Sequence, residues 1–156
     1  MGSSQSSSQS GTDYHGHWED GNTCSCSDNH WYSTSCVWEK VGLWNGFARF
    51  SANLGRFLLL RTAEIAMRGR DIAQESICVY FKCQNCGAQF SYTYELMKDN
   101  KLASCGIYKK VMEVYAVHQI SRPWSYYQGI FQRLSNYYDH IERNCQHWAE
   151  EFWKEI

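Results

Sequence analysis

Residues 77–96 read ICVYFKCQNCGAQFSYTYEL, two runs in which apolar or aromatic residues alternate with polar ones, joined by a short turn. Alternation at period two is typical of half-buried antiparallel strands, because successive side chains point to opposite faces of a sheet. The turn contains Cys83, Cys86 and Gly87, and glycine allows the positive φ that such a turn usually requires. This stretch therefore predicts two antiparallel strands that meet at a cysteine knuckle.

The flanking sequence extends this sheet and adds helices. Residues 98–101 are predicted as a hairpin turn and residues 107–118 as a third strand. Pro123, which is allowed in the first turn of a helix, introduces a stretch with one aromatic face, and a final helix begins at Asn144. An earlier helical stretch is predicted over residues 44–68. The predicted fold class is α+β, a small antiparallel sheet of about three or more strands packed by helices.

Composition divides the chain into three parts. Its 156 residues are 44% hydrophobic and 16% aromatic, which suits a globular domain with a real core. Residues 1–12 are rich in Ser and are predicted to be a disordered tail. Residues 13–38 interleave Cys and His with Trp and Tyr among small polar residues, and we expect irregular structure there, held by aromatic packing or by a metal. Residues 39–156 are predicted to form a single α+β domain.

Charge and targeting signals narrow the partners and the compartment. The formal net charge of -1 gives no general drive toward nucleic acid or anionic membranes. The sequence has no apolar run near ~18 residues and no secretory signal, so we expect a cytoplasmic protein. The first six residues match the N-myristoylation pattern, with Gly2 as the acylated amine. Membrane association is expected only if Gly2 is acylated, and an ordinary disordered tail is the alternative.

The eight cysteines raise the question of a metal site. In the cytosol, cysteines are more often thiols, metal ligands or reactive groups than disulfides. Cys83 and Cys86 have the spacing of a zinc half-site, and Cys105 follows after eighteen residues, but no second Cys-x-x-Cys completes the set. A fourth ligand would come from Cys78, or else from Cys36, Cys24, Cys26 or a histidine. Two interpretations stay open: a zinc site, with Cys83, Cys86, Cys105 and Cys78 as the candidate ligands, or no cofactor.

A further candidate lies in the C-terminal segment Asn144-Cys145-Gln146-His147-Trp148-Ala149. Asn is a preferred N-cap residue, so Cys145 is predicted to begin the helix and to face its apolar stripe. Free backbone N–H groups and the helix dipole favour an anion there, which makes a nucleophilic thiolate easier to form. The alternative is a cysteine that simply packs in the core, since free cysteine is among the most often buried residue types.

This six-residue segment, together with the tyrosine-rich stretch before it, resembles the nucleophile segment of circularly permuted papain-like proteins, such as the lecithin retinol acyltransferase-like and deSUMOylating isopeptidase-like families. The resemblance covers about residues 75–156 and implies a permuted papain-like fold. It implies Cys145 as nucleophile, Asn144 as the residue that positions the turn, and a histidine of an early strand as base. The implied substrate is a protein or a lipid acyl group. Residues 74–81 occupy the place of that early strand, and they contain no histidine.

Other histidines are therefore considered as the base. His118 closes a strand-like pattern and is the preferred candidate, while His147 is two residues from Cys145 and would point to another side of the helix. His30 and His140 stay open.

Two functions follow. One is thiol-dependent acyl transfer or amide or isopeptide hydrolysis, with Cys145, His118 and Asn144 as catalytic residues. The other is a catalytically inactive, zinc-stabilised binding or scaffold module of the same fold.

Overall fold

The computed structural model describes residues 18–42, 73–97, 100–109, 111–137 and 144–156, all of which fall in one compact unit. The predicted tail, the helical stretch over residues 44–68, Gly2 and His140 lie outside the described residues. The elements are β1 (Trp18–Asp20), the 3-10 helix η1 (Asp28–His30), β2 (Trp31–Gly42), β3 (Ala73–Cys83), β4 (Gln89–Leu96), β5 (Lys101–Tyr108), β6 (Val111–His118), α2 (Trp124–Arg133) and α3 (Cys145–Glu155). The α+β class is confirmed.

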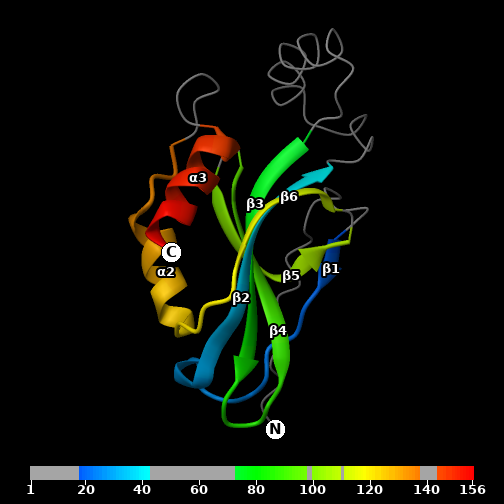
Figure 1. The fold of residues 1–156 in the computed structure, drawn as a ribbon. Helices are drawn as coiled ribbons and strands as arrows, with labels where there is room; N and C mark the ends of the chain where they lie inside the picture. The colour runs from blue at the N-terminus through cyan, green and yellow to red at the C-terminus, as the bar shows by residue number, and fades with distance from the viewer. Residues whose placement is uncertain (1–17, 43–72, 98–99, 110, 138–143) are drawn as a thin grey trace, which may run out of the picture. The chain divides into compact units, whose positions relative to one another are not determined.

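The strands form one six-stranded sheet in the order β1-β5-β4-β3-β2-β6, and every neighbouring pair is antiparallel (Figure 1). The long strands β2 and β3 pair from Trp31 opposite Cys83 to Gly42 opposite Ala73. The predicted sheet of about three or more strands is therefore confirmed and is twice the stated minimum. The pairing of β2 with β3 also fixes the region before residue 43 against the region after residue 72.

The turn between β3 and β4 has the geometry that the sequence predicts. The backbone N–H of Gly87 donates to the carbonyl of Cys83 at 2.8 Å, and the N–H of Cys83 donates to the carbonyl of Ala88 at 2.8 Å. Gly87 has a φ of 78°, in the left-handed region that favours glycine. The turn thus presents Cys83 and Cys86 at one end of the sheet.

Two expectations about the strands are wrong. Residues 31–38 are not irregular, because they belong to the twelve-residue strand β2. The small polar residues of β2 pair on one side with β3 and over its later part with β6, so tertiary pairing outweighs their weak strand preference. Residues 107–118 are not one strand either: β5 ends at Tyr108, and β6 pairs with β2 near the opposite edge of the sheet. Residues 109 and 110 are both Lys, so the sequence has no Gly or Pro signal for a turn between the two strands.

Helices α2 and α3 cover one face of this sheet (Figure 1). The core beneath them combines strand residues such as Ile77, Phe81 and Tyr94 with Tyr127 of α2 and Phe152 of α3. The rings of Tyr94 and Phe152 lie 5.2 Å apart. Both helices begin where the sequence predicts, after Pro123 and at Asn144. The two helices therefore close the apolar side of the sheet, as expected for an α+β layer structure.

Candidate metal centre

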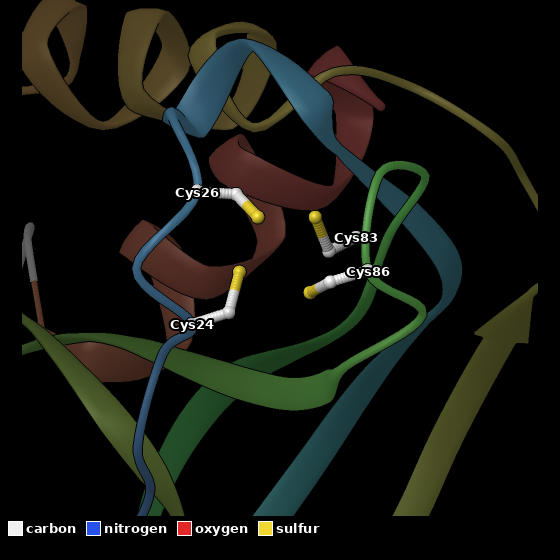
Figure 2. Close-up of side chains that lie close together, drawn as sticks. All are labelled: Cys24, Cys26, Cys83 and Cys86. Atoms are coloured by element: carbon white, nitrogen blue, oxygen red, sulfur yellow. The ribbon is translucent and has the colours of Figure 1, made fainter.

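Four cysteine thiols meet at the end of the sheet where β3 turns into β4. Cys24 and Cys26 lie on the segment between β1 and η1, and Cys83 and Cys86 lie at the end of β3 and in the turn that follows. Their sulfur atoms lie within 4.8 Å of one another and point toward a common centre (Figure 2). We call Cys24, Cys26, Cys83 and Cys86 the cysteine cluster.

Backbone pairing brings these two distant segments together. Trp31, the first residue of β2, is the pairing partner of Cys83, and the backbone N–H of Gln84 donates to the carbonyl of His30 at 2.8 Å. The segment that precedes η1 is thereby held against the β3–β4 turn. The two pairs of thiols come from positions 57 or more residues apart in the sequence, yet the β2–β3 pairing and the Gln84–His30 hydrogen bond bring their segments to one site.

The cluster also carries hydrogen-bond donors that suit thiolate sulfur. Burial raises the pKa of Cys83, but the N–H groups of Cys86 and Asn85 and the thiols of Cys24 and Cys86 outweigh it, so the pKa falls to about 7. The side-chain amide of Asn85 donates to the sulfur of Cys26 at 3.3 Å. An amide donor near a thiolate stabilises the charged form.

The same thiols limit how many can ionise together. The N–H of Ala88 lowers the pKa of Cys86, but desolvation and the neighbouring thiols Cys83, Cys24 and Cys26 raise it to about 11. Four thiolates this close repel one another unless a cation lies among them. The cluster therefore favours a bound cation at neutral pH, because a coordinating metal deprotonates its thiols.

The donor set fits a single soft or borderline metal ion. In a tetrahedral zinc site with Zn–S bonds of about 2.3 Å, the sulfur atoms lie about 3.8 Å apart. The separations of up to 4.8 Å in the cluster differ from this by about an ångström, and all four cysteines are free of disulfides. Four thiolates select Zn²⁺ or iron over Mg²⁺ and Ca²⁺, which prefer oxygen ligands. Zinc bound here would serve as a closed, structural centre with no position left for substrate.

The structure changes the predicted ligand set. Cys83 and Cys86 are in the cluster, and Cys24 and Cys26 complete it in place of Cys78 and Cys105. Cys78 is fully buried in the middle of β3, where burial raises its pKa to about 12. Cys105 lies in β5 opposite Tyr92, two strands away from β3.

The close spacing of Cys24 and Cys26 was the sequence signal that could have identified them as a pair of metal ligands. These two residues stood only among the alternatives for a fourth ligand. Their pairing with the knuckle depends on the strand register between β2 and β3, which no local motif reports.

Cys145 occupies the position that the sequence predicts. It is the first residue of α3, and the Asn144 side chain accepts hydrogen bonds from the N–H groups of Gln146 at 2.9 Å and His147 at 3.1 Å. The inward stripe is also confirmed, since Cys145, Trp148 and Phe152 are buried on α3. Cys145 is 3% exposed.

The structure places His118 against the end of α3 opposite to the one where Cys145 lies. His118 ends β6, and its ring lies 4.5 Å from the ring of Trp153. Trp153 follows Cys145 by eight residues, which is about 12 Å along a helix axis. His147 is exposed on α3, and His30 lies in η1. Where the resemblance places a histidine, Glu75 accepts a hydrogen bond from the indole N–H of Trp38 at 3.0 Å.

Comparisons of the chain with protein-family models, with curated proteins and with solved structures find no match. The papain-like resemblance accordingly stays a prediction. Within the residues that the structure describes, neither helix has the length and apolar character needed to cross a bilayer.

Proposed function

We propose that the chain is a zinc-stabilised binding module of α+β fold, with the cysteine cluster as its structural centre. The observation that carries the proposal is the convergence of four thiols from two distant segments within 4.8 Å. Clusters of this composition are typical of structural zinc sites, in which metal binding supplies part of the folding free energy.

Zinc at the cluster would add a cross-link between two segments that strand pairing and hydrogen bonds already bring together. Cys24 and Cys26 belong to a segment with little regular structure between β1 and η1, whereas Cys83 and Cys86 belong to the central hairpin β3–β4. Residues of this kind lose much conformational entropy on folding and bury little apolar surface in return. A metal ion that cross-links the segment to the hairpin offsets this cost.

The surface available for binding a protein partner lies on β6. Of the seven exposed large hydrophobic side chains among the described residues, five lie on this strand, namely Val111, Met112, Val114, Tyr115 and Val117. β6 is also the last strand in the sheet order, and Glu113 is its one acidic residue. Exposed apolar side chains gathered on one strand favour an interaction site, and a strand at a sheet edge offers backbone groups to an extended partner segment.

Metal content of the purified protein tests the zinc centre. We expect one equivalent of zinc, and reconstitution with Co²⁺ should give the visible absorption of tetrahedral thiolate coordination. Cys24→Ser should abolish that spectrum, while the matched variant Cys105→Ser should keep it, because Cys105 lies outside the cluster. Much less than one equivalent of tightly held metal, or equal loss in both variants, would end the proposal.

Thiol-dependent acyl transfer or amide hydrolysis is the second candidate function, acting on a protein or lipid acyl group. The capped position of Cys145 at the start of α3 favours it, because the helix N-terminus supports both a thiolate and a developing oxyanion. Alkylation of the zinc-loaded protein at neutral pH separates the two functions. Rapid, selective labelling of Cys145 that is lost in His118→Ala would support the enzyme. We expect slow labelling that His118→Ala leaves unchanged, because Cys145 is buried and His118 contacts Trp153 toward the other end of α3.

A further inference from the structure

Two glutamates lie buried on the face of the sheet that the helices do not cover. Trp38, Ile77 and Tyr94 are cross-strand partners that pack beneath the helices. Because side chains alternate along a strand, the adjacent positions Glu39 of β2 and Glu95 of β4 point to the opposite face. Glu39 pairs with Ser76 of β3, the strand between the two glutamates.

These side chains are excluded from water and are incompletely hydrogen bonded. Glu39 is 3% exposed, Glu95 is 2% exposed and Ser76 is fully buried. The Glu39 Oε1 atom and the Ser76 hydroxyl have no hydrogen-bond partner among the described residues. The Tyr108 hydroxyl lies 3.0 Å and 2.9 Å from the two carboxylate oxygens of Glu95, to which it donates. A buried carboxyl oxygen without a partner is costly when charged and much less costly when the group is protonated.

Among the described residues, the titratable groups coupled to the two glutamates supply no positive charge. Burial raises the pKa of Glu39 to about 7. Burial also raises the pKa of Glu95 to about 7, against the lowering effect of the Tyr108 hydroxyl, and the charge of Glu39 adds to the rise. The other titratable groups coupled to Glu39 are the Cys78 thiol and the Tyr80 and Tyr108 hydroxyls, all of which are neutral or negative.

We propose that Glu39 and Glu95 form a proton-binding pair that couples the stability of the sheet to pH across neutrality. The unpartnered Ser76 hydroxyl, held on the same face, is the neighbouring group available to the protonated Glu39. The proposal does not depend on the metal centre, because neither glutamate lies near the cysteine cluster in sequence or contacts it in the structure.

The direction of the pH dependence follows from the raised pKa values. An unfolded glutamate has a pKa near its ordinary value of 4.5, so the folded chain holds more protons than the unfolded chain between pH 4.5 and about 7. The stabilisation is complete below pH 4.5 and is lost as the pH rises through 7. This is opposite to ordinary acid denaturation, in which ionised carboxylates stabilise the folded state.

Unfolding by urea between pH 5.5 and 8.5 tests the proposal on the zinc-loaded chain. We expect the unfolding constant of the native protein to rise about tenfold per pH unit for each proton that unfolding releases. The constant should level off above pH 7, where the folded glutamates are also ionised. Glu39→Gln and Glu95→Gln should each remove part of this rise, and the double variant most of it. Glu75→Gln is the matched control, because Glu75 is also buried but accepts a hydrogen bond from Trp38.

An infrared measurement keeps the test decisive if a variant is too unstable to unfold cleanly. The native protein at pH 6 should show the C=O stretch of a protonated carboxyl group that disappears on titration above pH 8. Glu39→Gln should reduce this band, whereas Glu75→Gln should retain it. Stability profiles of Glu39→Gln and Glu95→Gln that run parallel to that of the native protein, or no protonated carboxyl band at pH 6, would overturn the proposal.

Discussion

The cysteine cluster and the Cys145 helix start are two thiol environments in one small fold, and they differ in almost every physical respect. The cluster gathers four sulfurs from two segments, with N–H donors directed at them, and Cys86 is exposed. Cys145 is a buried thiol whose helix begins with a well-formed cap, and the predicted base His118 contacts Trp153 instead. The difference teaches that a helix-start pattern predicts the position of a single thiol, whereas convergence of several thiols from distant segments favours one metal site.

Loss of the metal should have the largest effect on the free energy of unfolding. Cys83→Ser removes the most buried ligand of the cluster, and we expect the variant to lose about 4 kcal/mol or more of zinc-dependent stabilisation when free zinc exceeds Kd by about 1,000-fold. The measurement is the free energy of unfolding in urea, with zinc and with a chelator. The native protein should be much less stable in chelator, and Cys83→Ser should respond to neither.

Cys145→Ala provides the control for that experiment. This variant also removes one buried sulfur, but that sulfur lies outside the cysteine cluster. The stability of Cys145→Ala should therefore still depend on zinc. If a chelator changes the free energy of unfolding of the native protein by no more than it changes that of Cys83→Ser, the cysteine cluster does not hold a stabilising metal.

The sequence predicted the parts of the fold that depend on local pattern. Alternation between Ile77 and Leu96 predicted the β3–β4 hairpin, Gly87 predicted the positive φ, and Asn144 predicted the cap of α3, all of which the structure has. Each of these features is decided by a few neighbouring residues, through side-chain direction, steric freedom at glycine or a hydrogen bond within one turn.

Features that depend on long-range pairing were not predictable in the same way. The partners of Cys83 and Cys86 are fixed by the register of β2 against β3, across residues 43–72, and single-sequence patterns carry no register. The position of His118 depends likewise on β6 leaving β5 and pairing with β2. The sequence spacing therefore identified two of the four cysteines of the candidate metal site, and the other two required the sheet.

Asn85→Ala should have an intermediate effect, a loss of zinc affinity at the cysteine cluster. The side-chain amide of Asn85 donates to the sulfur of Cys26, so Asn85→Ala removes a hydrogen bond from a candidate ligand without removing the ligand. Hydrogen bonds to metal ligands are worth about 10-fold to 100-fold in affinity, and we expect the lower value because Asn85 is exposed. Competition with a chromophoric chelator measures the zinc affinity. Gln84→Ala, an exposed neighbour, should leave the affinity unchanged, and equal affinity in the native protein and Asn85→Ala would show that this amide does not support a metal ligand.

Asn144 is the asparagine beside the other thiol, Cys145, and its hydrogen-bonding role is the reverse of that of Asn85. Asn144 accepts from backbone N–H groups, whereas Asn85 donates to sulfur. Asn144→Ala should therefore cost about 1 kcal/mol of stability, and Asn144→Gly only a few tenths, since glycine is a tolerable N-cap. Urea unfolding at fixed zinc measures both, with the exposed Asn136→Ala as a control near zero. Zinc affinity should not change in either Asn144 variant. A faster alkylation of Cys145 in Asn144→Ala would mean that the cap keeps this thiol sealed, while a slower one would mean that the cap helps to activate it and would favour the nucleophile over the packing residue.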